Sequence, residues 1–270
     1  ENWEHIRRYM LWDYVFPTVQ LVLAAGVLAA VLGVALAWLV AAYDFPLRRL
    51  FRWALVLPLA MPPYIAAYTY AHMLSYTGIV QTSLRNAGIH ANPAWFDIMS
   101  MQGAVFIFVM FLYPYVFLIV RAFLERSGGS YVENARLLGR RGFSLFFRVA
   151  LPIARPAVAG GAALVAFEVL SDYGVVNYYG IQTLTTAIFK TWFGLYDIES
   201  ATRLSAWFMI GILAVVVLER LIRRRRRYST AAERGAPLRP VRLGGAKGWL
   251  ASALCLAVLA VSFLIPVAQL

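Results

Sequence analysis

Residues 14–43 read YVFPTVQLVLAAGVLAAVLGVALAWLVAAY, a run of 30 amino acids that contains no charged side chain. About 20 predominantly apolar residues are enough for a helix to cross the hydrocarbon core of a bilayer. The whole chain of 270 residues is 61% hydrophobic, whereas an ordinary soluble domain is about 45–50% apolar. The run predicts a membrane-spanning helix, and the composition predicts that lipid surrounds much of the protein.

Further uncharged runs occupy residues 53–84, 98–120, 173–189, 204–218 and 248–270. Together with the first run they predict an all-α, polytopic transmembrane helical bundle with about six spans. The expected spans are residues 17–41, 53–76, 98–120, 156–178, 204–222 and 248–270. Pro58, Pro62 and Pro63 lie in the second expected span. Because proline removes a backbone donor, this span is expected to bend and to face the interior of the bundle.

The net charge of +12 is concentrated in alternate segments between the spans. Segments 44–52, 121–155 and 219–247 carry +2, +5 and +8, whereas the other segments carry −1, 0 and −2. The positive-inside rule assigns the three basic segments to the cytoplasm, which predicts a multi-pass plasma-membrane protein. The arginine run at residues 223–227 is then the basic segment that flanks the cytoplasmic end of a membrane span. Nucleic acid is therefore rejected as a partner.

The residue pattern does not predict an enzyme or a metal site. Cys255, the single cysteine, lies in the last expected span and offers neither a disulfide framework nor a cysteine metal site. His72 is a lone histidine and is expected to be a packed or outward-reaching side chain and not a metal ligand. No Gly-x-x-x-x-Gly-Lys-Ser/Thr loop occurs. Any ATP hydrolysis is therefore expected in a separate subunit.

The cytoplasmic segment 121–155 has the pattern of two short helices joined by a turn. Gly128 and Gly129 break the preceding span, and Ser130 stands three residues before Glu133. That spacing is the spacing of a capping box, so a helix is expected to start at Ser130.

The first of these helices is expected to be amphipathic. Its apolar side is formed by Val132, Ala135 and Leu138. Its charged side is formed by Arg136, Arg140 and Arg141. A second helix is expected over residues 143–151 and is predicted to end near Pro152, with Pro156 starting the next span.

In this segment the chain resembles the permease subunits of binding-protein-dependent ABC importers. Their signature is Glu-Ala-Ala, three residues, Gly, nine residues, then Ile, any residue and Leu-Pro. The matching positions, with valine in place of Ile, are Glu133, Ala135, Gly139, Val149, Leu151 and Pro152. Asn134 departs from the first Ala of the signature, which puts one packing contact in doubt. The resemblance implies that this ATPase-coupling loop docks in a cleft of an ATP-binding cassette subunit.

Other stretches resemble the fused ferric-iron permeases, in which two homologous halves form one polypeptide. They are residues 43–46, 57–62, 171–174 and 180–194, the last with Gln182, Thr183 and Lys190. This resemblance implies a type I importer permease of a bacterial inner membrane. Residues 1–227 are then the first-half permease domain, 228–247 a cytoplasmic linker of Gly- and Pro-rich composition, and 248–270 the first span of a truncated second half.

The resemblance also implies the partners and the cargo. The expected partners are ATPase subunits, a periplasmic or other extracytoplasmic substrate-binding protein, and membrane lipid. No cofactor is expected on this chain, because ATP and Mg belong to the partner ATPase. Ferric iron is the expected cargo, with thiamine, sulfate or polyamine as other solutes. A channel or membrane scaffold without an ATPase is the alternative from another class.

Three residues near the end of the fourth span are candidates for the translocation path: Glu168, Asp172 and Tyr173. Glu168 and Asp172 are four apart and would share one helix face. Because ionisable groups inside a membrane are expensive and usually functional, a cation pathway is one hypothesis for this pair. A position at the outer water boundary explains the same residues without a pathway, and the tyrosine also fits an aromatic belt.

Overall fold

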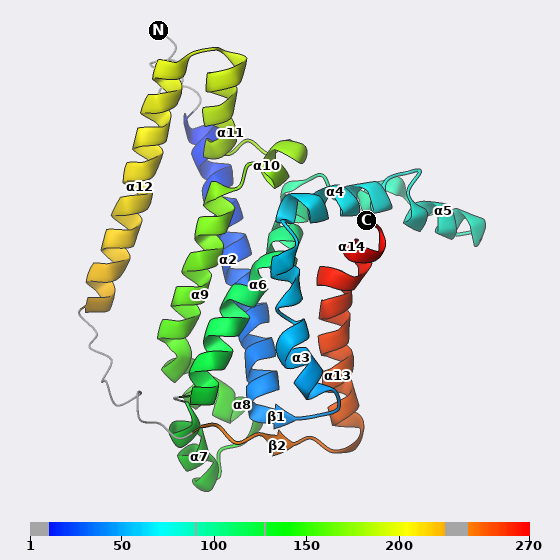
Figure 1. Ribbon diagram of the computed structural model, residues 1–270, viewed down its shortest axis with the longest axis vertical. Coiled ribbons are helices and arrows are strands. Elements are labelled where there is room, and N and C mark those ends of the chain that lie inside the picture. The colour runs from blue at the N-terminus through cyan, green and yellow to red at the C-terminus, as the bar shows by residue number, and fades with distance from the viewer. Residues whose placement is uncertain (1–10, 90, 127, 225–236) are drawn as a thin grey trace.

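The computed structural model describes residues 11–89, 91–126, 128–224 and 237–270, and the long elements in these ranges are helices. The longest are α2 (Leu11–Ala42), α6 (Met101–Arg126), α9 (Leu151–Ser171), α12 (Ile198–Arg224) and α13 (Gly245–Leu259). Figure 1 shows α2, α6 and α9 side by side, α13 on one flank and α12 at the opposite edge. Residues 225–236 lie outside the described residues; they include the last three arginines of the predicted run and the first nine residues of the predicted linker.

Short elements occupy both ends of this bundle (Figure 1). The end that we call inner carries β1 (Tyr43–Asp44), α3 (Arg48–Ala54), α7 (Gly129–Leu137), α8 (Gly142–Leu145), the π-turn η4 (Phe146–Ala150) and β2 (Val241–Arg242). Toward the opposite, outer end lie η2 (Leu57–Ala60), α4 (Pro63–Leu74), α5 (Ile79–Asn86), η3 (Pro93–Phe96), α10 (Gly174–Tyr178), α11 (Leu184–Phe189), η5 (Lys190–Gly194), η7 (Ala260–Leu264) and α14 (Ile265–Ala268). The predicted cytoplasmic segments 44–52 and 121–155 share the inner end with the described residues 237–247.

The core of the bundle is the packing of α2 and α9 against α6. Gly33 of α2 and Gly161 of α9 both approach Val116 of α6. A Cβ atom at Gly33 would lie 2.7 Å from the Val116 Cβ, and one at Gly161 would lie 2.7 Å from the Val116 Cα. Small residues permit such close backbone approach in membrane bundles, where dispersion and not hydrophobic exclusion drives helix association. Val116 is fully buried between the two neighbouring helices.

The second predicted span is not one straight helix. The pair Arg48–Ala60 and Pro63–Asn86 bends by 89° between its two parts. At the break Met61 is extended, with φ −107° and ψ 120°, because a residue before proline avoids the helical region and Pro62 and Pro63 cannot donate to the preceding turn. By length and composition, the described residues contain four helices able to cross a membrane, or five if this bent pair is one span.

α13 packs against the bent second span. The Ser252 hydroxyl of α13 donates to the carbonyl oxygen of Pro46, and the Tyr70 hydroxyl of α4 donates to the carbonyl oxygen of Val261 at 2.5 Å. Cys255 is buried and free, as its place in the last span predicts. On α6, the Tyr113 hydroxyl donates to the carbonyl oxygen of Leu55 at 3.0 Å. The Leu55 carbonyl lies in the bent second span, the Val261 carbonyl lies in the π-turn η7, and Pro46 precedes α3. In lipid, such bonds give a backbone acceptor a partner that water cannot supply.

The glycine contacts yield a matched test on one helix. We expect Gly161→Ala to destabilise the protein by about 1–3 kcal/mol, because the added methyl group meets the backbone of α6. Gly160→Ala adds the same group at a position with nothing within 4 Å, so its melting temperature should equal that of the wild type or exceed it. Thermal unfolding in detergent measures both variants. Equal melting temperatures for the two variants would contradict the packing described.

Candidate functional site

The predicted coupling loop lies at the inner end of the bundle, where Figure 1 shows α7 below the bundle and α8 beside the lower ends of α2 and α6. α7 begins at Gly129, with Gly128 as its N-cap residue and without a side-chain cap. The start predicted at Ser130 is therefore one residue late, and Ser130 lies inside the first turn. The reason is that the backbone of α7 already closes at Gly128, whose carbonyl accepts the Val132 N–H at 3.2 Å.

The Glu133 carboxylate of the signature forms contacts within the chain. It pairs with the Arg136 guanidinium at 2.9 Å and accepts the backbone N–H of Arg239 at 3.4 Å. Arg136 also donates to the carbonyl oxygens of Arg239, at 2.8 Å, and of Ala42, at 3.3 Å. Arg136 is predicted on the charged side of α7. Its side chain is instead largely covered, because it binds two carbonyl groups of neighbouring segments.

The apolar side of α7 is shorter than predicted. Val132 and Ala135 are buried, whereas Leu138 is 85% exposed. The helix ends at Leu137, and Gly139 follows with φ +85°. Leu138 is thus the C-cap residue and lies beyond the last turn of α7, and the left-handed glycine ends the helix. Gly142, which begins α8, also has a positive φ, of +54°.

The second coupling helix does not end at Pro152. α8, the π-turn η4 and α9 form one continuous helix over Gly142–Ser171. Pro152 has no N–H to donate to the carbonyl of Arg148, and the wider π-turn at Phe146–Ala150 immediately precedes it. Val149 and Leu151, the other signature residues here, pack against the buried core. The loop is therefore the inner extension of a membrane helix.

Exposed apolar side chains and arginines share the tip of this loop. Leu137, Leu138 and Phe143 are each 84–85% exposed. Arg140 and Arg141, between them in sequence, are also exposed, and Arg140 donates to the Ser144 hydroxyl at 2.9 Å. Three large apolar side chains at a basic, water-facing tip form a surface suited to a protein partner. We call these five residues the coupling tip.

The three candidate path residues lie at the outer end but in different settings. Glu168 is exposed on α9 and accepts a hydrogen bond from the Tyr115 hydroxyl at 3.2 Å. The Asp172 carboxylate accepts the backbone N–H groups of Val175 at 3.0 Å and Val176 at 3.2 Å, so it caps α10. The Tyr173 ring stacks on Phe189, with 4.1 Å between ring centroids. The two carboxylates therefore have separate partners.

A hollow of about 450 Å³ opens beside Tyr173 at the outer end. Its polar lining includes Asn177, Gln182 and Lys190, with Phe189 and Phe193 as its aromatic part. We call it the outer vestibule. Our prediction of path residues omitted Asn177, Gln182 and Lys190, although Gln182 and Lys190 belong to the stretch 180–194 that resembles ferric permeases. The π-turn at Lys190–Gly194 is a further sign, since such turns are frequent at functional sites.

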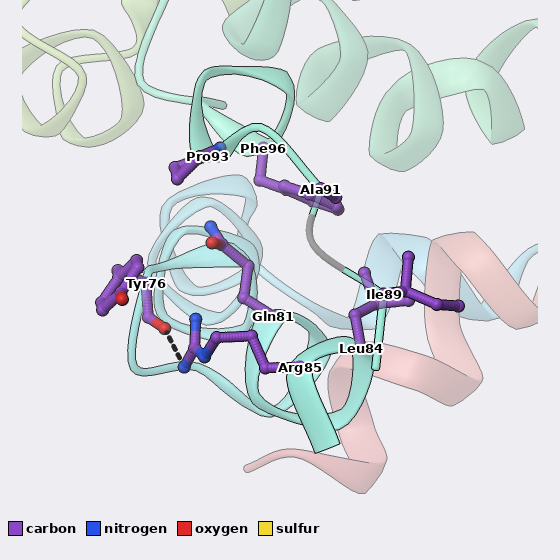
Figure 2. A pocket seen from close by; sticks show the side chains of 8 residues that line it. All are labelled: Tyr76, Gln81, Leu84, Arg85, Ile89, Ala91, Pro93 and Phe96. Atoms are coloured by element: carbon purple, nitrogen blue, oxygen red, sulfur yellow. Dashed lines mark hydrogen bonds between the residues drawn. The ribbon is translucent and has the colours of Figure 1, made fainter. Parts of the chain in front are cut away.

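A smaller outer hollow, of about 200 Å³, lies between α5 and residues 91–96 (Figure 2). The Arg85 guanidinium lies 4.3 Å from the centroid of the Tyr76 ring and donates to the Tyr76 carbonyl oxygen at 2.8 Å. The Gln81 amide donates to the carbonyl oxygen of Leu74 at 2.8 Å. Arg85 and Gln81 thus already have backbone hydrogen-bond partners close in sequence, and the local fold accounts for this hollow.

The described residues contain no group of three or more His, Cys, Asp or Glu side chains that could hold a metal ion. In the described part of the chain, Asp172 caps α10 and Glu168 accepts the hydrogen bond from Tyr115.

These features define an integral membrane protein of the permease class. The profile of the family described as "Binding-protein-dependent transport system inner membrane component" matches residues 33–228. The chain belongs to this family and is thus a component of an inner-membrane transport system. The match includes the coupling loop and the outer vestibule, and excludes β2 and α13.

The chain is similar to curated permeases for different solutes. It is 29% identical over 178 residues to the sulfate transport system permease protein CysT of Escherichia coli, covering 66% of this chain and 62% of that protein. It is 27% identical over 199 residues to the Fe(3+)-transport system permease protein FbpB 2 of Haemophilus influenzae, covering 74% of this chain and 35% of that protein. The chain thus spans less than two thirds of either relative.

The fold is similar to a chain in the crystal structure of a bacterial alginate ABC transporter in complex with an alginate pentasaccharide-bound periplasmic protein. The TM-score is 0.63 at 15% sequence identity, over 86% of this chain and 82% of that one. This similarity confirms the predicted all-α permease fold. It carries no information on the solute, because the two sequences have diverged too far.

The environment of Asp172 predicts a pH dependence of stability. Burial raises the pKa of this carboxyl to about 6, against the two backbone donors that favour its charged form. Because the folded pKa lies above the unfolded value, its stabilising contribution is complete at low pH and is lost as the pH rises from about 4 to 6. We expect the melting temperature of the wild type to fall, relative to that of Asp172→Asn, across this range. Parallel pH profiles for the two proteins would contradict the assignment.

Proposed function

We propose that this chain forms part of the translocation pathway of an ATP-driven importer and receives its driving force at the coupling tip. The observation that carries the proposal is the tip itself, where Leu137, Leu138 and Phe143 are exposed beside Arg140 and Arg141. Family membership supports a transport role, and the signature resemblance supports ATP-binding cassette subunits as the partner. ATP and Mg bind on those subunits, and this chain carries out no bond chemistry.

The continuous helix Gly142–Ser171 gives the proposal a mechanical route. Its inner end belongs to the coupling tip, and its membrane part packs closely on α6 through Gly161. A displacement of the tip on ATP binding moves α9 against α6 and so changes access to the passage. The energy for such a change is the differential affinity of the ATPase for the two states of the bundle. An extracytoplasmic binding protein docks at the outer end.

The docking surface is tested by a charge placed on an exposed side chain. We expect Leu138→Glu to abolish copurification of the ATPase subunit with the full transporter, because it introduces a desolvation cost at the centre of the apolar contact. The monomer fold should be unchanged, since Leu138 is exposed. Ile79→Glu, an exposed apolar residue at the outer end, is the control and should retain the ATPase. Full retention of the ATPase by Leu138→Glu would refute this docking site.

We propose ferric iron as the cargo. The stretch that resembles ferric permeases, residues 180–194, supplies Gln182 and Lys190 to the outer vestibule, so the resemblance coincides with a place where cargo enters. The similarity to a Fe(3+)-transport permease supports the same cargo. Since the described residues contain no metal-holding cluster, the chain would pass the ion along and not store it.

A sulfate-like oxyanion is the second candidate. Lys190, Asn177 and Gln182 supply a positive charge and amide donors to the vestibule, and this donor set suits an anion. The similarity to sulfate permeases supports this cargo as well.

Uptake of radioactive ferric iron and of radioactive sulfate, by cells whose only importer of either kind is this one, separates the two cargoes. We expect iron uptake with the wild type and with Lys190→Gln. If the cargo were sulfate, uptake of sulfate would be seen instead. Lys190→Gln would then reduce it by about tenfold, as expected for the loss of one charged hydrogen bond.

A further inference from the structure

Residues 237–243, in the described part of the linker, lie against α7. Leu238 is buried and belongs to the hydrophobic core of the bundle. Arg239 follows with an exposed side chain, yet both of its backbone groups are bound. Its N–H donates to Glu133 at 3.4 Å, and its carbonyl oxygen accepts from Arg136 at 2.8 Å. The linker is thus held by its backbone, through two charged side chains of α7.

The linker then pairs with the chain that joins α2 to α3. β2 lies parallel to β1, with Val241 opposite Tyr43 and Arg242 opposite Asp44. The N–H of Leu243 donates to the carbonyl oxygen of Asp44 at 2.8 Å. Figure 1 shows this two-stranded pair crossing beneath the bundle from α7 to α13.

The path from α7 to α13 is short and fixed at each step. Gly245 begins α13 directly after the β2 strand, and the Ser252 hydroxyl binds the carbonyl oxygen of Pro46. A Cβ atom at Gly248 would lie 3.2 Å from the Pro46 side chain. The start of α13 therefore has little freedom to move independently of residues 43–46 and of α7.

We infer that residues 238–243 are a strap that transmits displacement of the coupling helix to α13. The inference rests on the proposed function, because it needs an ATPase that moves α7. It assigns Glu133 and Arg136 a positioning role within the chain, since their charged groups hold the strap while the exposed coupling tip meets the partner. One coupling loop then drives two membrane helices, α9 through the continuous helix and α13 through the strap.

The strap is tested with two substitutions at one exposed side chain. Arg239→Pro removes the N–H that Glu133 accepts, whereas Arg239→Ala removes the exposed side chain and keeps both backbone groups. Both are made in the full-length permease assembled with its ATPase. Hydrogen exchange of α7, of residues 239–243 and of the first turns of α13 is compared without nucleotide and after trapping with ATP and vanadate.

We expect the wild type and Arg239→Ala to change exchange in all three segments together on trapping. In Arg239→Pro, exchange at Arg242 and Leu243 should rise by about tenfold without nucleotide, because a charge-assisted bond is lost. Its response to trapping should be confined to α7. Leu238→Ser, which weakens the buried anchor, should behave like Arg239→Pro.

A concerted response in Arg239→Pro and Leu238→Ser, equal to that of the wild type, would overturn the strap. So would an equal loss of the α13 response in Arg239→Ala, because that variant keeps the backbone bonds. ATPase copurification separates this failure from failure of the proposed function. If the ATPase copurifies with Arg239→Pro, the docking site is intact and the exchange data test the strap alone. If the wild type binds no ATPase, the proposed function itself fails.

Discussion

The close approach of three helices at Val116 is the constraint on which the rest of the structure depends. Gly33 and Gly161 allow α2 and α9 to touch the backbone of α6 from both sides. In lipid such contact is a main source of helix association, because apolar side chains gain little by leaving hydrocarbon for a protein interior. A bundle held in this way is closely packed, so a displacement of α9 also displaces α6 and α2.

In such a closely packed bundle, the second half of the proposed coupling loop is the inner end of a continuous membrane helix. A flexible loop would absorb displacement through its backbone torsions, whereas the run from Gly142 to Ser171 is continuous. The π-turn at Phe146–Ala150 accommodates Pro152 without ending that helix. The signature therefore combines two kinds of residue. Val149 and Leu151 join the helix to the core, and Gly139 exposes the tip.

Charged residues at the inner end form contacts that stabilise the fold, and they also fix the orientation of the chain in the membrane. Arg52 pairs with Glu125 at 2.9 Å and ties α3 to α6. Arg136 and Glu133 bind the backbone of the linker. Arg140 and Arg141 remain exposed at the tip. Basic residues that fix orientation in the membrane are thus also available to bind carbonyl groups at helix ends.

The sequence by itself determined the class of fold, since uncharged runs of helical length and alternating basic segments have few structural solutions in a bilayer. It also predicted a short helix and a turn within segment 121–155, because glycines and prolines at fixed spacing act locally. Its prolines predicted a bend in the second span, though not the angle of 89°. It did not reveal the covered Arg136 or the bound linker. Those features are contacts between segments distant in sequence. Only the tertiary structure decided them, because a charged side chain or a free backbone group takes whichever partner the packed helices bring within reach.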